Sequence, residues 1–306
     1  KGWRGSLSNK RKHKNWREEL SNFNLEKSLG WQLAVIKRID KFETVIETQN
    51  EKKGVINFND IDWTRKEFKK LFKIGDVIYV KKVSDDNYSL KQLPTANGGI
   101  VVMDPYSGRV LALSGGFSFK KSEFNRASQA KRQPGSVFKP FVYTSAIDNG
   151  YPVSKQLLNQ PLVLRVLNSE GEWEKWMPRN YDGTTSGLTS LREGIRKSIN
   201  LVAVRVVKEL VPASEVKSIS KRMGITTDIR AVDAIALGTS EVYLLDMVSA
   251  YSAFPNQGVL NKPFGITKVE DRYGNTIQEY DPIREEVLRA ESAYIMTSML
   301  QTVMDA

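Results

Sequence analysis

Apolar and polar positions alternate in the first third of the chain. Between Trp31 and Leu93, β-branched and aromatic residues form four segments, several of them alternating, which predict strands at 33–40, 42–49, 53–58 and 76–83. A helical pattern at 62–72 lies between the third segment and the fourth. Short strands around one helix predict a small β-domain over residues 31–95, and a barrel of the OB type is its most specific interpretation.

The pattern changes after residue 96, where helices dominate. Pro, Asn and two Gly residues at 94–99 predict a linker before this second module. Turn residues between alternating segments predict two hairpins, at 99–116 and 266–280. Apolar positions at helical spacing predict helices at 136–150, 191–198, 201–210, 213–224, 241–254 and 289–304. Strands before and after a block of helices indicate an α+β domain over 96–306, in which the helices pack on an antiparallel sheet.

The first 30 residues are polar and basic. We expect an irregular arm or linker over 1–30, with one short helix at 16–20. This arm holds eight Lys and Arg against three Asp and Glu, within a net charge of +11 for the chain. Such a segment can contact nucleic acid, anionic lipid or an anionic polymer, although plain solvation is the simpler interpretation.

The two ends of the sequence suggest that it is part of a longer protein. The chain starts with Lys1, contains no apolar run of the ~18 residues that a membrane span needs, and stops inside the helix expected at 289–304. From the sequence we therefore expect a membrane anchor upstream and further chain downstream.

Composition limits the chemistry that the chain can carry out. There is no Cys, which excludes disulfides and thiolate metal sites, and the one His is His13 in a polar run. A Ser-His-Asp triad within this chain would need His13, which we expect to be a solvated surface residue. A catalytic base is therefore expected among Lys, Glu and Asp, and no metal or cofactor site is predicted.

One candidate for nucleophilic chemistry is Ser136-Val-Phe-Lys139, which opens the helix expected at 136–150. Residues i and i+3 share a helix face, so the Lys139 amine can reach the Ser136 hydroxyl and act as its base if its pKa is lowered. The helix N-terminus favours negative charge on the serine oxygen and disfavours a charged lysine. The spacing alone is weak evidence, because Ser214-Glu-Val-Lys217 matches it too.

A second candidate, Ser198-Ile-Asn200, falls between two of the predicted helices. A hydroxyl and an amide two residues apart on a short turn can point into one cavity, where Ser198 could relay a proton and Asn200 could hold a substrate amide. Ser and Asn are also common at ordinary helix breaks, so this pair is weak evidence by itself.

Together and in this order, the two candidates resemble the Ser-x-x-Lys and Ser-x-Asn motifs of penicillin-binding proteins and β-lactamases. Longer stretches are similar to the transpeptidase domain of class A, bifunctional penicillin-binding proteins, over about residues 96–306. These stretches are GGIVVMDPYSGRVLALSGG, NRASQAKRQPGSVFKPFVY, PRNYDGTTSGLTSLREGIRKSINLVAVRV and ALGTSEVYLLDMVSAYSAFPNQG. The sequence GWRGS and the β-rich segment before the domain resemble the subgroup that carries an OB-like domain there.

This resemblance implies a serine D,D-transpeptidase that cross-links peptidoglycan outside the cytoplasmic membrane. It implies that Ser136 attacks the D-Ala-D-Ala bond of a donor stem peptide, with Lys139 as general base. Ser198 would relay a proton to the leaving group, and Asn200 would orient the substrate amide. β-Lactams would acylate the same serine. The expected partners are stem peptides, glycan strands and, through the OB-like domain, regulators of cell-wall synthesis, with no nucleic acid.

The sequence departs from the family pattern at the third motif. No Lys-Thr-Gly or Lys-Ser-Gly follows Asn200, and Gly183-Thr-Thr185 lacks the Lys and comes before Ser-x-Asn. In the family this motif lies on an edge strand, supplies half of the oxyanion hole and holds the substrate carboxylate. We therefore expect these residues alone to show no transpeptidation and little acylation by β-lactams. The glycosyltransferase half of the class is also absent and is expected upstream.

Two other functions stay open on the sequence. A β-lactamase or β-lactam sensor shares the Ser-x-x-Lys chemistry, but residues 140–197 offer no clear acidic base for deacylation. An inactive binding module, which contacts glycan or nucleic acid through the basic arm and the β-domain, is the second alternative. Most aromatic residues of this region fall at positions typical of a core, which favours packing over base stacking. They are Trp31, Phe42, Phe58, Trp63 and Tyr79.

Overall fold

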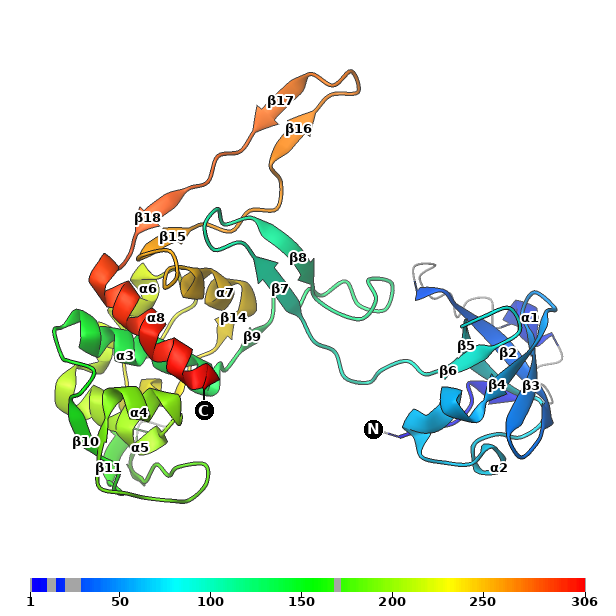
Figure 1. The fold of residues 1–306 in the computed structure, drawn as a ribbon, viewed down its shortest axis with the longest axis horizontal. Helices are drawn as coiled ribbons and strands as arrows, with labels where there is room; N and C mark the ends of the chain where they lie inside the picture. Colours follow the sequence, from blue (N-terminus) through cyan, green and yellow to red (C-terminus); the bar gives the residue numbers. More distant parts are fainter. Residues whose placement is uncertain (1, 10–14, 20–28, 168–171, 306) are drawn as a thin grey trace. The chain divides into compact units, whose positions relative to one another are not determined.

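The computed structural model describes residues 2–9, 15–19, 29–167 and 172–305, which form two compact units (Figure 1). The first unit holds the described residues up to Asn97 together with Phe117–Glu123, and the second holds Gly98–Gly116 and the described residues from Phe124 onward. His13, which the sequence suggested to be a solvated surface residue, lies outside the described residues. None of the described helices is both long and apolar enough to cross a membrane.

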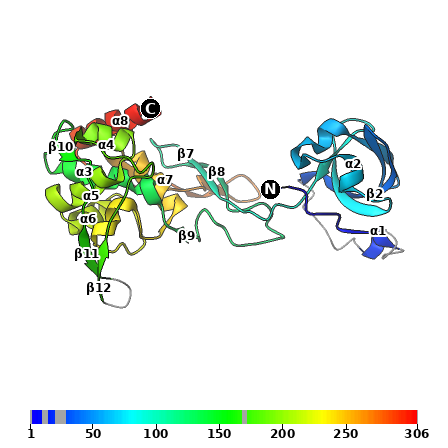
Figure 2. The ribbon, with the colours of Figure 1, turned by 90° about the horizontal axis from the view of Figure 1, so that it is seen from below.

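The first unit is a curved antiparallel sheet with short helices (Figures 1 and 2). Its elements are β1 (Ser8–Asn9), α1 (Trp16–Glu19), β2 (Trp31–Ile39), β3 (Glu43–Thr48), β4 (Lys53–Asn57), the 3₁₀ helix η2 (Phe58–Thr64), α2 (Phe68–Leu71), β5 (Asp76–Lys82) and β6 (Tyr88–Lys91). The strand order is β1-β5-β2-β3-β4, and β6 pairs with β5. A bridge between Val55 and Asn87 joins β4 to the segment before β6, so the sheet curls towards closure. The small OB-like barrel predicted from the sequence is confirmed.

The core of this unit follows from the alternation of its strands. Ile46 on β3, Ile56 on β4 and Ile78 on β5 are completely buried in one cluster. Each such side chain contributes about 1.5–3 kcal/mol when it leaves water. The helix predicted at 62–72 is wrong in its length, because Arg65 adopts a left-handed conformation with φ of 56° and separates η2 from α2.

The N-terminal arm and the aromatic residues of the first unit match the sequence-based expectations only in part. The short helix expected at 16–20 is present as α1, and the buried Trp16 packs in the cluster of Leu33 and Val35. The arm also adds β1 to the sheet. The expectation of core positions holds for Tyr79 but is wrong for three aromatic residues with exposed side chains. These are Phe42, Phe58 and Trp63, which are exposed at 72%, 45% and 43%.

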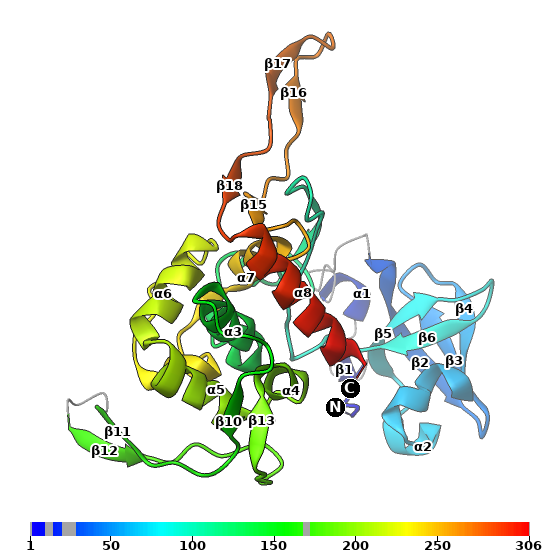
Figure 3. The same ribbon diagram turned by 60° about the vertical axis from the view of Figure 1, so that its left-hand side comes forward.

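The second unit combines helices with paired strands. Its helical elements are the 3₁₀ helix η3 (Gly135–Phe138), α3 (Lys139–Asp148), α4 (Leu191–Arg196), α5 (Asn200–Arg205), the π-helix η4 (Val206–Leu210), α6 (Ala213–Arg222), the 3₁₀ helix η5 (Asp233–Leu237), α7 (Leu244–Ser252) and α8 (Ala290–Met304). The six helices predicted from apolar spacing are therefore present, two of them with a 3₁₀ or π-helical segment. The buried α3 lies at the centre and packs against α4, α6 and α8 (Figure 3).

The strands of this unit form pairs. They are β7 (Ile100–Met103) with β8 (Val110–Ser114), β9 (Lys131–Arg132) with β14 (Val242–Tyr243), β10 (Gln156–Leu158) with β13 (Leu188–Ser190), β11 (Leu164–Leu167) with β12 (Trp173–Trp176), β15 (Val259–Asn261) with β18 (Arg284–Glu286), and β16 (Lys268–Glu270) with β17 (Thr276–Glu279). Both predicted hairpins, β7–β8 and β16–β17, are confirmed, and the second extends away from the helices (Figures 1 and 3). The mixed α+β class is confirmed, and the described strands of this unit make no sheet of more than two strands.

Candidate active site

Ser136 lies on a 3₁₀ turn that leads into α3. This turn, Gly135–Phe138, is called the serine turn below; it starts at Gly135 with φ of 58° and closes with the Lys139 N–H donating to the carbonyl of Ser136. Phe138 is buried and its ring centre lies 5.0 Å from that of Phe141 on α3. One face of the serine turn is therefore anchored in the core, while the Ser136 side chain stays exposed.

Two residues from later in the chain hold the serine turn. Gly238, which ends η5, accepts a hydrogen bond from the Gly135 N–H at 3.2 Å. Its φ is 65°, and a Cβ atom there would lie 2.2 Å from the Gly135 carbonyl oxygen. The Tyr251 hydroxyl on α7 donates to the carbonyl oxygen of Val137. Sequence reasoning assigned no role to either residue, although both lie in a stretch that carried the family resemblance.

Lys139 is the first residue of α3, and its side chain is only 1% exposed. Its ammonium group donates to the Ser198 carbonyl oxygen at 2.6 Å, to the Ser198 Oγ at 3.0 Å and to the Asn200 Oδ1 at 2.7 Å. Burial lowers the pKa of Lys139 from 10.5 to about 8, because the charged form loses its hydration. The lysine is therefore fixed in place, and it loses its proton at a lower pH than an ordinary lysine does.

Ser198 and Asn200 come from the link between α4 and α5, where the sequence placed them. Ser198 has φ of 52°, a conformation that non-glycine residues rarely adopt and that turns its carbonyl and hydroxyl towards Lys139. The Asn200 amide also donates from Nδ2 to the carbonyl of Arg179 at 2.9 Å. The structure thus brings three of the four predicted site residues together in one hydrogen-bonded group.

Ser136 joins this group through a shared cavity. A cavity of about 590 Å³ is lined by Ser136, Lys139 and Ser198. The other lining side chains are mostly apolar, and most of them come from α8, from the end of α7 and from the residues that follow α7. Lys139 was expected to reach the Ser136 hydroxyl, but its three hydrogen bonds go to Ser198 and Asn200 instead, and the Ser136 hydroxyl bonds to none of the described residues.

The Ser-x-x-Lys match at Ser214 and Lys217 differs from the first in the surroundings of its lysine. Ser214 is exposed near the start of α6, and Lys217 forms an ion pair with Asp228 at 3.1 Å, with 37% of its side chain exposed. Spacing is the same in the two matches, but only Lys139 is buried beside polar acceptors. Among the described residues no group of three His, Asp or Glu side chains could hold a metal ion.

Comparison with known families agrees with the fold. The family model described as the penicillin binding protein transpeptidase domain matches residues 98–306, and that of the penicillin-binding protein OB-like domain matches residues 3–96. The chain therefore belongs to the penicillin-binding protein transpeptidase family. The resemblance predicted from the sequence is confirmed.

Individual relatives narrow the similarity to one type of penicillin-binding protein. The chain is 36% identical to penicillin-binding protein 1A of Rickettsia prowazekii over 271 residues, which cover 87% of the chain and 34% of the relative. It is 31% identical to penicillin-binding protein 1A of Pseudomonas aeruginosa, covering 84% and 32%. The crystal structure of penicillin-binding protein 1A from Haemophilus influenzae superposes with a TM-score of 0.86 at 26% identity, covering 99% of the chain and 49% of that structure. The chain thus spans about a third of the length of these curated relatives.

Proposed function

We propose that this chain is the acyl-transfer part of a peptidoglycan D,D-transpeptidase and a target of β-lactams. The observation that carries the proposal is Lys139, a buried amine with a lowered pKa that bonds to the Ser-x-Asn residues beside the cavity of Ser136. The family membership supports the same chemistry, since its models are named for transpeptidation and penicillin binding.

In the proposed first step, the Ser136 Oγ attacks the carbonyl carbon of the D-Ala-D-Ala bond of a donor stem peptide. Neutral Lys139 takes the hydroxyl proton, which a pKa of about 8 permits in a fraction of molecules at neutral pH. The bond to the terminal D-Ala breaks, and its nitrogen receives a proton through Ser198, whose hydroxyl contacts the Lys139 amine. An ester between Ser136 and the donor remains.

In the second step, an amine of a neighbouring stem peptide attacks this ester, passes a proton back to the site and frees Ser136. Asn200 would orient the donor amide, because its side chain is held on two sides by Lys139 and the Arg179 carbonyl. A β-lactam would follow only the first step, because its ring nitrogen stays attached to the acyl group and blocks the cavity.

The setting of this activity is part of the proposal. We place it at the outer face of the cytoplasmic membrane, in a protein that also carries a glycosyltransferase and an anchor. Peptidoglycan strands would be its substrates, and residues 31–95 would form a separate domain that contacts regulators of cell-wall synthesis. Residues 96–306 would be the transpeptidase domain. The relatives, all of which are longer than this chain, support this arrangement.

A fluorescent penicillin tests the proposal, with the bound label read on a denaturing gel and located by peptide mass spectrometry. We expect slow labelling of Ser136 in these 306 residues, since they contain no Lys-Thr-Gly strand. Joining such a segment after Ala306 should raise the labelling rate by about 10²–10³, the typical contribution of an oxyanion-hole donor.

Two serine variants make the test specific. Ser136→Ala should abolish labelling in the extended protein, whereas Ser214→Ala, in the exposed match of the same spacing, should leave it unchanged. Equal labelling of the Ser136→Ala variant would refute the proposal. Rapid turnover of nitrocefin, instead of a long-lived ester, would assign the site to a β-lactamase.

A further inference from the structure

The orientation of the Asn200 side-chain amide is set from two sides. Its Oδ1 accepts from the Lys139 ammonium at 2.7 Å, and its Nδ2 donates to the Arg179 carbonyl at 2.9 Å. An ammonium group can only donate and a backbone carbonyl can only accept, so both partners favour the same orientation of the amide. The position of the Arg179 carbonyl therefore helps to decide which atom of Asn200 faces Lys139.

The Arg179 carbonyl matters most once Lys139 has lost its proton. A neutral amine has a lone pair, and in the proposed first step this lone pair takes the proton of Ser136. If the Asn200 amide turned over, its Nδ2 would donate to the lone pair and compete with the serine hydroxyl. Because the Arg179 carbonyl holds Nδ2, the amide keeps its Oδ1 towards the amine and the lone pair stays available.

Asn180, the residue after Arg179, fixes this backbone segment against α5. Its Oδ1 accepts from the Leu201 N–H at 3.1 Å, in the first turn of the helix. The side chain of Ile199, which precedes α5, caps none of the free N–H groups of that turn, so Asn180 supplies an acceptor from 21 positions earlier in the chain. The bond from Leu201 to Asn180 thus lies one residue along each segment from the bond between Asn200 and Arg179.

The Nδ2 group of Asn180 is bonded as well. It donates to the Asn159 Oδ1 and to the Thr184 carbonyl, both at 2.7 Å. Asn159 is buried, and its own amide donates to the Ser186 hydroxyl at 3.0 Å. Both hydrogens of the Asn180 amide and its oxygen therefore have partners, so its side chain is held in one orientation.

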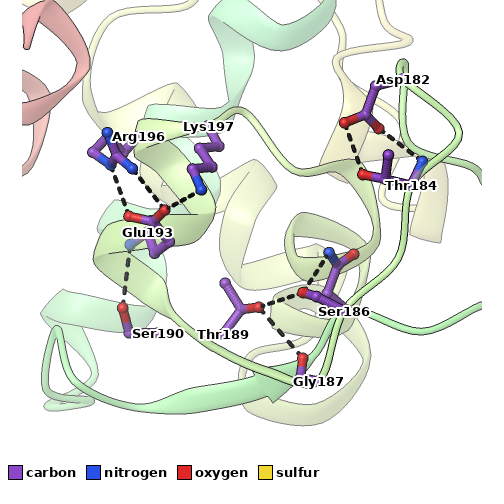
Figure 4. Close-up of polar contacts among 10 residues, drawn as sticks. Asp182, Thr184, Ser186, Gly187, Thr189, Ser190, Glu193, Arg196 and Lys197 are labelled. Carbon is purple, nitrogen blue, oxygen red and sulfur yellow. Dashed lines mark hydrogen bonds and ion pairs between the residues drawn. The ribbon is translucent and has the colours of Figure 1, made fainter. Parts of the chain in front are cut away.

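The loop that follows Asn180 is closed by hydrogen bonds of its own. Asp182 accepts from the Thr184 backbone N–H at 3.0 Å and from the Thr184 hydroxyl at 2.8 Å (Figure 4). Further along the loop, the Ser186 and Thr189 hydroxyls lie 3.4 Å apart (Figure 4). These bonds keep the Thr184 carbonyl and the Ser186 hydroxyl in place, and a support of this kind orients the functional side chains that rest on it.

We propose that Asn180 is a positioning residue of the site: through the Arg179 carbonyl it holds the Asn200 amide with Oδ1 towards Lys139, and so keeps the lysine free to take the serine proton. The three hydrogen bonds of Lys139 go to Ser198 and Asn200, so Asn180 acts on the lysine only through Asn200. This inference rests on the proposed function in one respect, because a free lone pair matters only if Lys139 is the base.

Titration of Lys139 tests the inference without needing the reaction. The whole chain is labelled with ¹³C-lysine, and the Cε resonance of Lys139 is followed with pH. In Asn180→Ala the Asn200 amide is free to turn, so its Oδ1 supports the ammonium less and its Nδ2 can stabilise the neutral amine. Both effects favour the neutral amine, so we expect the midpoint to fall by about half a pH unit, or roughly threefold in the ionisation constant. Asn275→Ala removes an exposed loop amide that bonds to Asp271 at 2.9 Å, and it should leave the midpoint unchanged.

A double-variant cycle separates positioning from a general loosening of the site. In Asn200→Leu no amide is left to orient, so adding Asn180→Ala should not move the midpoint further. Asn159→Ala removes one of the two acceptors of the Asn180 Nδ2 and should cause a smaller fall in the same direction; if circular dichroism shows that Asn180→Ala does not fold, this variant decides the test. An unchanged or raised midpoint in the deciding variant, or an equal fall with and without the Asn200 amide, would overturn the inference.

Separate readouts distinguish this inference from the proposed function. If a fluorescent penicillin labels Ser136 but Asn180→Ala leaves the Lys139 midpoint unchanged, the function stands and the positioning role is wrong. If the midpoint falls as expected while the extended protein never takes the label, the effect of Asn180 on the lysine stands and the transpeptidase proposal fails.

Discussion

Lys139 should titrate near pH 8 in the folded protein, far below an ordinary lysine. Its side chain is 1% exposed, and burial lowers its pKa from 10.5 to about 8. The difference corresponds to a cost of about 3 kcal/mol for keeping the ammonium in the site at neutral pH. At pH 7 about one molecule in ten would hold the neutral amine that general-base catalysis requires.

NMR of the protein with ¹³C-labelled lysine measures this directly. The Cε resonance of Lys139 is identified by its absence in Lys139→Met, and its shift is followed from about pH 6 to about pH 11. We expect a midpoint near pH 8. A midpoint at or above the ordinary value of 10.5 would refute the argument that burial dominates the hydrogen bonds to the charged form.

Asn200→Leu tests how far hydrogen bonding contributes to the pKa of Lys139. The Asn200 Oδ1 accepts from the Lys139 ammonium at 2.7 Å and so stabilises its charged form. A hydrogen bond to a charged group contributes about 1.5–3 kcal/mol. Leucine has a similar volume but no acceptor, so we expect the midpoint to fall by a further pH unit or so, to about pH 7. A rise of the midpoint in this variant would contradict the proposed geometry.

The same shift makes stability depend on pH. The folded-state pKa of Lys139 is below its unfolded value, so between about pH 8 and about pH 10.5 the unfolded chain binds more protons than the folded one. Stability therefore rises with pH in this window. Between about pH 7 and about pH 9.5 the gain is about 2 kcal/mol for the wild type relative to Lys139→Met, measured by urea unfolding of both proteins. If the free energy of unfolding depended on pH equally in the two proteins, this prediction would be refuted.

Two substitutions, Gly238→Ala and Tyr251→Phe, test the scaffold around the serine turn, and each is compared with a variant elsewhere in the same unit. Gly238→Ala places a methyl group 2.2 Å from the Gly135 carbonyl oxygen, so we expect the free energy of unfolding to fall by more than about 2 kcal/mol and penicillin labelling to slow down. Gly274 also has a positive φ but lies in open space. Gly274→Ala should therefore lower the free energy of unfolding by only about 1 kcal/mol and leave labelling unchanged. Tyr251→Phe removes the hydrogen bond to the serine turn and should cost about 1 kcal/mol. Tyr143→Phe removes a buried hydroxyl with no partner among the described residues and should be neutral or stabilising. Urea unfolding gives the free energy of unfolding of each variant. An equal loss in the two glycine variants, or in the two tyrosine variants, would contradict these expectations.

The sequence predicted regular elements well where periodicity decides the outcome. The strands of the first unit and the helices of the second were located from apolar spacing. At the start of α4, the Ser190 hydroxyl caps the helix by accepting from the Glu193 N–H. In a full capping box the Glu193 carboxylate would also accept from the Ser190 N–H, but this carboxylate pairs with Arg196 and Lys197 instead. Competition between a local cap and nearby cations depends on side-chain geometry that spacing does not contain.

The remaining differences come from backbone conformation and long-range contacts. Nothing in the pattern at 62–72 signals that Arg65 turns left-handed and divides the expected helix. The contacts of Gly238 and Tyr251 with the serine turn join residues about a hundred positions apart, so no local pattern reports them. The sequence does place Gly238 and Tyr251 in a stretch that resembles the family, but resemblance alone does not say what a residue touches.

The four candidate site residues show most clearly what a motif leaves undecided. Ser136 and Lys139 have the same spacing as Ser214 and Lys217, and both pairs lie at the start of a helix. The difference is the environment of the lysine: an exposed Lys217 gains an ion pair with a carboxylate, which leaves it a surface cation, whereas Lys139 is buried among neutral oxygens. Neutral acceptors fix the amine without balancing its charge, so burial can lower its pKa. We therefore infer that Ser-x-Asn makes Ser-x-x-Lys reactive by supplying acceptors that are polar but uncharged, and that replacing Asn200 with Asp would raise the pKa of Lys139 and suppress acylation.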